Sequence, residues 1–576
     1  MKNILKANLD SLNEEQLPVA KHKLHGGKYF AGLFSGEHIA ATEFVIGATF
    51  VALGATTKDI LLGLLIGNIL AVLTWTFVTA PIAVQTRLSL YTYLNKIAGD
   101  SMSKLYNWAN AVIFTVISAA MITVSASAVR LLFDIPAQLN WYSTNINFIL
   151  IVIGVGAVVV CVAIYGFKTV ADFSSICAPW LFVLFLSGAF ELLPALSHNV
   201  LGSTSITGWS DFLHIGNNSI WKGVTDTGEE GIGLIEVIGF AWAANSITHL
   251  GLIDMALFRF AKKSSYGLYS SFGMLFGHYL AWIAAGVMGA GAAILLKDSV
   301  VNLDPGDVAY KALGASGFVI VIVAGWTTAN ANLYRAGLAA QAIFKKHSRK
   351  KVTMIVGFFT VIVACFPFVF SRILPLLTYA GLLVIPVGAI VFAEHYIFPK
   401  IGFTRYWAHY KNLKTSKPAI ASWVLGLVFG IGLNALNFMS FYYLFIPTWI
   451  FTIILYTILC KYYGATENYD IEISQEKRLQ KDIEEFQQEQ AKTYHKEKKD
   501  KRVFTVVLRV ISILFLLVIV SLAVNTFMFS INFDDYLKNK TLFNTYAFVA
   551  TLGYFVTAYW ALKRTKSVNK NLKENI

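Results

Sequence analysis

Charged residues are scarce in this sequence, and their scarcity excludes most soluble folds. Asp, Glu, Lys and Arg make up 14% of the 576 residues, whereas soluble domains carry about a quarter. Hydrophobic residues make up 56%, and the mean hydropathy is +0.60. The chain is therefore too apolar to be soluble and too long to be a single membrane anchor. Its apolar runs are continuous rather than alternating, which excludes a transmembrane β-barrel.

Cysteine and catalytic motifs are also nearly absent. The four cysteines, Cys161, Cys177, Cys365 and Cys460, fall in or at the end of apolar runs without C-x-x-C spacing, which favours packing roles. The sequence contains no H-E-x-x-H, no G-x-x-x-x-G-K-[ST] and no G-x-S-x-G. We therefore predict neither an enzyme nor an ATP-driven pump.

Fourteen apolar runs are predicted to cross a membrane. Each is long enough for a hydrocarbon core about 30 Å thick. The predicted spans are 36–57, 60–84, 105–132, 147–171, 176–196, 232–258, 270–296, 316–343, 352–370, 373–393, 419–437, 439–461, 503–529 and 542–562.

The positions of lysine and arginine predict the orientation of these spans. If the N-terminus is cytoplasmic, most of the 47 basic residues fall on the inner side, for example in KHK (21–23), RFAKK (259–263), KKHSRKK (345–351) and KRTK (563–566). We expect a multi-pass cell-membrane protein with both termini in the cytoplasm. This distribution also explains the net charge of +14 without a nucleic-acid partner.

The chain divides into segments by composition. The polar residues 1–35 are predicted to be a cytoplasmic segment rather than a signal peptide. The remaining predicted segments are a ten-helix core (36–396), two further spans (397–461), a charged cytoplasmic helix or linker (462–502), a terminal helix pair (503–562) and a tail (563–576). In the charged segment Leu479, Ile483 and Phe486 form one apolar stripe at helical spacing. The outer loop 197–231 either covers an extracellular mouth or is a plain connection.

Three spans carry polar groups at depth, where such groups are costly unless they face a cavity or a partner. The first contains Glu43, which is either a neutral, protonated acid or structural pair, or a group that couples transport to a proton or polarises the substrate. The sixth is interrupted at AANSITHLG (243–251), which includes Asn245, with Phe240 and Trp242 just before the interruption. Such a pattern is typical of a discontinuous helix that lines a wet cavity.

The eighth span reads GWTTANANLYRAGL (325–338). At helical spacing Thr327 shares a face with Asn330, and Thr328 shares one with Asn332. Such residues also join helices to one another, but their density beside two glycines favours a binding site. The interrupted first and sixth spans are five spans apart, which predicts an inverted repeat with substrate and ion at the breaks.

Four stretches resemble the nucleobase–cation symporter family, which includes cytosine permease and hydantoin transporters. They are ILLGLLIGNIL (60–70), FRFAKKS (258–264), WTTANANLYRAGL (326–338) and LPLLTYAGLLVIPVGAIVFAEHY (374–396). The resemblance implies an all-α membrane protein with a LeuT-type 5+5 inverted repeat. It also implies import of a flat heterocycle together with Na+ or H+.

The resemblance also implies a set of site residues. The family's sodium site would use backbone carbonyls near Ala41 and Phe44 together with the hydroxyls of Thr327 and Thr328. Its base-stacking aromatic residues would correspond to Phe114 in the third span and Phe240 or Trp242 in the sixth.

The chain departs from the family's pattern at several of these positions. The third span has Phe114, Ala111 and Asn110 where the family has a tryptophan and a nearby glutamine, and Ala329 replaces an asparagine. Glu43 has no counterpart in the family's pattern. We therefore expect an altered ligand pocket.

These observations predict a secondary active transporter for a nucleobase or related planar heterocycle. Asn245, Asn330 and Asn332 would orient the ligand, because an amide offers both a donor and an acceptor. The expected partners are this small molecule, the coupling ion and the lipid bilayer, with no cofactor. Two alternatives stay open: an amino-acid or osmolyte symporter of the same fold, and a transporter-like receptor that signals through 464–502.

Overall fold

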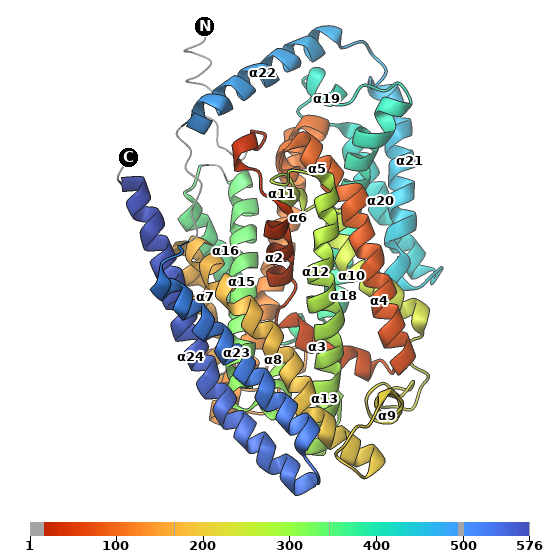
Figure 1. Cartoon of the computed structure of the whole chain (residues 1–576). Coiled ribbons are helices and arrows are strands. Elements are labelled where there is room, and N and C mark those ends of the chain that lie inside the picture. The colour runs from red at the N-terminus through yellow and green to blue at the C-terminus, as the bar shows by residue number, and fades with distance from the viewer. Residues whose placement is uncertain (1–16, 166, 345, 493–499, 575–576) are drawn as a thin grey trace.

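The computed structural model describes residues 17–165, 167–344, 346–492 and 500–574. The side chains of 37, 165–173, 245–249 and 569–574 lie outside the described part. These ranges form a helical bundle in which α22 (Asp470–Lys492) lies across one end and α9 (Trp209–Ile215) lies at the other (Figure 1). We call these two ends the α22 face and the α9 face.

Ten helical segments in the described ranges are long and apolar enough to cross a membrane. They correspond to ten of the fourteen predicted spans. Their bounds are Thr57–Thr86, Leu90–Phe133, Ile146–Ile164, Ser174–Leu201, Ser264–Leu296, Ala315–Ile343, Ile373–Lys400, Lys417–Ala435, Phe441–Tyr463 and Val503–Phe529.

The other four predicted spans are helical but do not meet the same length and composition. The first is split into α2 (Gly27–Glu37) and α3 (Thr42–Ala52), and the sixth into α10 (Leu234–Leu250) and α11 (Met255–Phe258). The ninth crossing is α16 (Arg349–Ala364), which is short, and the fourteenth is α24 (Phe533–Glu574), which is rich in polar residues.

The remaining helices of the bundle are α4 (Thr57–Thr74), α5 (Ala80–Thr86), α6 (Leu90–Val129), α7 (Ile146–Tyr165), α8 (Phe167–Leu201), α12 (Ser271–Gly273), α13 (Trp282–Leu296), α14 (Pro305–Leu313), α15 (Ala315–Ile343), α17 (Phe368–Ser371), α18 (Ile373–Phe392), α19 (Trp407–Tyr410), α20 (Lys417–Ala435), α21 (Phe445–Tyr463) and α23 (Val503–Phe529).

The start of the first crossing differs from the prediction. The bundle begins at Gly27 rather than at residue 36, because α2 has an apolar face that is buried against neighbouring helices. Phe30 and Phe34 on this helix are fully buried and pack on Phe258 of α11. The N-terminal half of the first crossing therefore lies inside what composition suggests is a cytoplasmic segment.

The packing of the helices follows the predicted inverted repeat. The inverted repeat relates crossing one to crossing six and crossing two to crossing seven. The contact of crossing one with crossing seven (α3 with α13) therefore has a counterpart in that of crossing six with crossing two (α10 with α4), and the structure contains both contacts. The repeat also relates crossing three to eight and crossing four to nine. The contacts of α6 with α15 (three with eight) and of α7 with α16 (four with nine) are therefore their own counterparts, and both are present. The chain therefore has the LeuT-type 5+5 architecture with broken first and sixth helices.

The charged segment after the twelfth crossing forms α22, as predicted, and is held on the bundle by polar contacts. Glu484 pairs with Lys21 and Arg87 at 3.3 Å, and Glu476 pairs with Lys96 at 2.5 Å. Hydrogen bonding, chiefly from His409, holds the pKa of Glu476 below its ordinary value. Of the predicted apolar stripe, Ile483 and Phe486 are buried against Leu17, whereas Leu479 is 40% exposed because it lies beyond this contact.

The terminal pair α23 and α24 packs against α8, the fifth crossing. The Trp180 indole donates to Thr551 Oγ1 at 3.0 Å, the Tyr554 hydroxyl donates to the Ile176 carbonyl at 2.6 Å, and the Thr204 hydroxyl donates to the carbonyl of Ser530 at 2.6 Å. These hydrogen bonds join the two added helices to the ten-helix core.

Candidate functional site

The first break separates α2 from α3 between His38 and Ala41, and Glu43 organises its far side. Glu43 lies in the first turn of α3 and is 1% exposed. One of its oxygens accepts from the Thr42 hydroxyl at 3.1 Å and from the Ala40 amide at 3.3 Å. The other accepts a short bond from the indole N–H of Trp282 at the start of α13. The carboxyl group thus satisfies a helix N-terminus and ties α3 to the seventh crossing.

The second break separates α10 from α11 and lies at 251–254. The sequence placed the interruption earlier, at 243–251, but α10 continues to Leu250. The chain turns because Leu252 adopts a left-handed conformation with φ of 63°, which is rare for a branched residue. Asp254 immediately precedes α11, is 3% exposed, and accepts from the Trp75 indole at 2.5 Å.

A glycine on a neighbouring helix closely approaches each break. A Cβ added to Gly277 would lie 1.9 Å from the His38 carbonyl oxygen, and one added to Gly388 would lie 1.5 Å from that of Leu250. Both distances are far below any real contact, so only glycine allows these backbones to meet. The ends of the interrupted helices are therefore packed against the seventh and tenth crossings.

An aromatic cluster lies beside the first break. The ring of Phe240, a predicted substrate residue on α10, is 4.9 Å from Phe50 and 5.7 Å from Trp282 between centroids. Because Trp282 also binds Glu43, the structure brings Phe240 and Glu43, both predicted site residues, to the same indole. The flat faces of these rings can stack a planar ligand.

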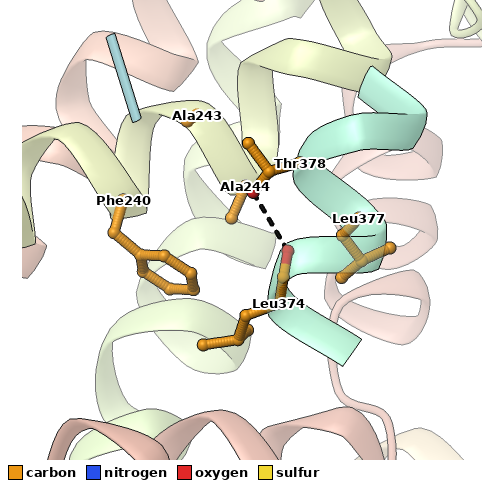
Figure 2. Close-up of a pocket in the computed structure, with 6 residues that line it drawn as sticks. All are labelled: Phe240, Ala243, Ala244, Leu374, Leu377 and Thr378. Carbon is orange, nitrogen blue, oxygen red and sulfur yellow. Dashed lines mark hydrogen bonds between the residues drawn. The ribbon is translucent and has the colours of Figure 1, made fainter. Parts of the chain in front are cut away.

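A pocket opens next to this cluster, between α10 and α18. Figure 2 shows the side chains of Phe240 and Leu374 pointing into it from the two helices. The Thr378 hydroxyl, its main polar group, donates to the Leu374 carbonyl at 3.0 Å. The lining residues are Phe240, Ala243, Ala244, Leu374, Leu377 and Thr378. The pocket is mostly apolar and encloses about 10 Å³, room for about one water molecule.

The polar residues of the eighth crossing lie on α15 and bond back to their own helix. Thr327 Oγ1 donates to the Val323 carbonyl at 2.9 Å, and the amide nitrogens of Asn330 and Asn332 donate to carbonyls one turn earlier. These bonds use hydrogens only, so the oxygen lone pairs stay available. Among the described residues, Asn330 Oδ1 is buried without a hydrogen-bond partner, which is uncommon for a native amide.

The predicted third-span aromatic residue is on α6, next to α15. Phe114 is buried, and the guanidinium of Arg335 lies 5.7 Å from the centre of its ring. The Ser118 hydroxyl donates to the Ala329 carbonyl at 2.9 Å, and a Cβ on Gly325 would lie 2.2 Å from Ser125 Oγ. Small and polar residues therefore bring these two helices close together.

The other predicted residues have separate surroundings. Trp242 turns away from Phe240: its indole donates to Thr74 at 3.1 Å, and its ring packs on Phe445 of α21. Ala41 and Phe44 are buried at the first break, where the Phe44 ring lies 4.4 Å from that of Phe185. Asn245 belongs to α10, but its side chain lies outside the described residues.

Sequence reasoning missed the indole partners of the two breaks. Trp75 and Trp282 sit inside apolar runs, where an aromatic residue normally packs against lipid or core. Asp254, in HLGLID, falls within the predicted sixth span (232–258), and no role is predicted for it. An acidic residue within an apolar span was the available signal for Asp254, as it was for Glu43.

Comparison with known proteins places the fold. No protein-family model and no curated protein matches the chain. The structure is similar to that of Mhp1 in an inward-facing conformation, with a TM-score of 0.61 and 15% identity over 78% of this chain and 94% of that one. It is similar to a closed, bromovinylhydantoin-bound structure of Mhp1, a nucleobase-cation-symport-1 family transporter, with a TM-score of 0.59 and 14% identity over 82% and 99%.

A Na+-coupled sialic acid symporter in a substrate-bound, outward-open state is also similar. Its TM-score is 0.52, with 11% identity over 81% of this chain and 94% of that one. At these identities the likeness establishes the shared fold. The expected LeuT-type architecture is thereby confirmed.

Proposed function

We propose that this chain is a cation-coupled secondary transporter that imports a neutral planar heterocycle, such as a nucleobase, and that it is a divergent relative of the nucleobase–cation symporters. The two interrupted helices carry the proposal, because this feature puts helix ends and freed backbone groups halfway across the bundle. The solved structures compared above include a nucleobase-cation-symport-1 family transporter and a Na+-coupled sialic acid symporter.

The carboxyl groups at the breaks support a neutral substrate. The N-terminus of a half-helix is a favourable place for the anionic group of a substrate. In this chain the carboxyl group of Glu43 already occupies that place on α3, and Asp254 stands directly before α11. A carboxylate substrate would compete with these two side chains for the helix ends, which disfavours an amino acid or a sugar acid.

The aromatic cluster supports a flat substrate. Phe240 would stack the ring, while Asn330 and Asn332, together with Phe114 on the facing helix, would contact its edge and other face. The buried, unpartnered Asn330 Oδ1 supplies an acceptor of the kind that an exocyclic amine or ring N–H requires. Trp242, which faces α21, would support α10 rather than contact the ligand.

We assign the coupling ion to Na+ at Thr327, Thr328 and the backbone carbonyls of Ala41 and Phe44. The Thr327 hydroxyl donates its hydrogen backward, so its oxygen can accept a hard cation. One Na+ moving down about 100 mV supplies about 2.3 kcal/mol, which supports roughly 50-fold accumulation. Glu43 would hold α3 against α13 rather than carry a proton, since both of its oxygens already accept hydrogen bonds.

The proposal is tested by uptake into proteoliposomes with and without an inward Na+ gradient. Purines, pyrimidines and hydantoins form one panel, and amino acids and sialic acid form the other. We expect Na+-stimulated uptake of a member of the first panel only. Stimulated uptake of an anionic compound, or none of any compound, would overturn the substrate assignment.

Thr328→Ala tests the ion site against a matched control. We expect this variant to lose Na+ stimulation while it retains normal expression. Thr360→Ala, which removes a buried hydroxyl bonded to its own helix on α16, should keep it. A Thr328→Ala protein that responds to Na+ like the control would rule out this ion site, and uptake driven equally by a pH gradient would identify H+ as the coupling ion.

A further inference from the structure

Each broken helix carries, just past its break, a buried carboxyl group that binds the indole of a neighbouring helix. Trp282 donates to Glu43 in the first crossing, and Trp75 donates to Asp254 in the sixth. Both tryptophans are 1% exposed. Each bond therefore joins two helices where no water competes for it, and a hydrogen bond in such surroundings is stronger than one in water.

The internal repeat relates these two pairs. Glu43 is on crossing one and Trp282 on crossing seven, while Asp254 is on crossing six and Trp75 on crossing two. Exchanging the two halves of the bundle turns the first pair into the second. Both tryptophans also adjoin a π-helical segment, Trp75–Thr79 in one case and Met274–Ala281 in the other, and such segments are frequent at functional sites.

The two pairs hold half-helices that lead to opposite faces. After Glu43, α3 runs to the α9 face, where Thr56 pairs with Lys222 and the Ile232 amide donates to the Leu53 carbonyl. After Asp254, α11 runs to the α22 face, where Ala261 pairs with His25. Each pair therefore restrains the half-helix on one side of the bundle.

A row of rings connects the two pairs through the centre. The His38 ring lies 5.8 Å from Trp75 and 4.9 Å from His278. The His278 ring in turn stacks on Trp282 at 4.5 Å with an interplanar angle of 12°. The two indoles are therefore linked through the two imidazole rings that lie between them.

We propose that Glu43–Trp282 and Asp254–Trp75 are symmetry-related latches that decide which face of the transporter opens. Their residues are positioning residues: they set the angle of α3 and α11 against the neighbouring helices. This inference rests on the proposed transport function, because two faces that open in turn are what a transporter needs. Both latches are closed in this structure.

The test uses single cysteines as reporters, in purified detergent-solubilised protein whose four native cysteines have been replaced. Ala48→Cys reports on α3, since Ala48 faces α13, where a Cβ on Gly289 would lie 3.5 Å from its own. Ala261→Cys reports on the far end of α11, where Ala261 is 1% exposed. The rate of reaction with a water-soluble maleimide is measured without substrate and without Na+.

Trp282→Phe keeps the ring but removes the N–H, so we expect labelling at 48 to rise about tenfold while labelling at 261 does not rise. Trp75→Phe should do the reverse. Trp423→Phe is the matched control, because it removes a buried indole bond to the Leu383 carbonyl and should raise neither rate. If a tryptophan variant does not fold, Glu43→Gln and Asp254→Asn should give smaller rises in the same directions.

Unchanged rates, or both reporters rising together in either single variant, would overturn the latch proposal. The same rise in Trp423→Phe would also overturn it, since it would indicate general loosening. Because labelling needs no substrate, the outcome is independent of the uptake assay. A chain that transports with unresponsive reporters refutes the latches alone, and one with responsive reporters but no transport refutes the proposed function alone.

Discussion

Gly388→Ala should destabilise the protein although alanine is the better helix former. Gly388 lies inside α18, and its added Cβ would lie 1.5 Å from the Leu250 carbonyl oxygen and 2.6 Å from the carbon. To reach even 3.0 Å, α10 and α18 must separate by about 1.5 Å at the second break. The neighbouring atoms are backbone, so no side chain can turn aside to make room.

The magnitude follows from two opposing terms. Alanine in a helix gains about 1 kcal/mol over glycine, whereas overpacking costs about 1–3 kcal/mol. Because the overlap is with a carbonyl at a fixed turn, we expect the upper end and a net loss of about 2 kcal/mol. Moving the end of α10 also shifts Leu252 and the start of α11, so uptake should fall as well.

Thermal unfolding in detergent, followed by tryptophan fluorescence, measures this loss. Gly154→Ala in α7 is the matched control, because no atom lies within 4 Å of its added Cβ and only the gain in helix propensity remains. The unfolding midpoint should fall by a few degrees in Gly388→Ala and stay level or rise in Gly154→Ala. A Gly388→Ala midpoint at or above that of the control would refute the close approach of the two backbones.

Three further predictions concern polar contacts at the two faces. Arg130→Met removes the guanidinium that bonds Asp304 at 2.7 Å and Asp307 at 2.5 Å. It should cost about 3–5 kcal/mol by leaving buried carboxylates unpaired, and a wild-type unfolding midpoint would contradict this. Glu484→Gln should raise amide hydrogen exchange in residues 17–25 a few-fold, because each exposed ion pair contributes about 0.2–1 kcal/mol; unchanged exchange there would show that α22 does not hold this segment. Glu476 has a lowered pKa, so its contribution to docking is complete above its ordinary value of 4.5 and is lost as pH falls below it. Proteolysis of α22 should therefore increase in acid, and this pH dependence should be weaker in Glu476→Gln.

The long apolar spans were predictable because lipid demands nearly continuous hydrophobicity over about 20 residues. The runs around 503–529 and 373–393 satisfy that demand by themselves, and both form membrane-length helices. The helix α2 is covered by neighbouring helices, so it needs only a few hydrophobic residues to be buried in the bundle. Composition alone therefore could not place its start at Gly27. On α24, Lys540 and Thr551 are buried, and they bond the Ala312 carbonyl and the Trp180 indole.

The site was predictable only where a polar residue stood out from an apolar background. Glu43 and the α15 asparagines were visible for that reason, whereas Trp75 and Trp282 were not, since nothing in an apolar run distinguishes a bonded indole from a packed one. The position of the second break depends on the left-handed Leu252 and on the approach of Gly388, which is a tertiary contact. Local sequence suggested an interruption a few residues too early.

The attachment of the terminal hairpin to α8 has a consequence for shortened forms of this protein. A chain cut before residue 503 would remove the acceptor of the Trp180 indole and turn the fully buried Glu191 toward hydrocarbon. The lipid interior offers no replacement partner for the indole and no solvation for the carboxyl group. The last two crossings therefore cover the polar groups of the fifth. A chain truncated to twelve spans should insert poorly into the bilayer even though both of its core repeats are complete.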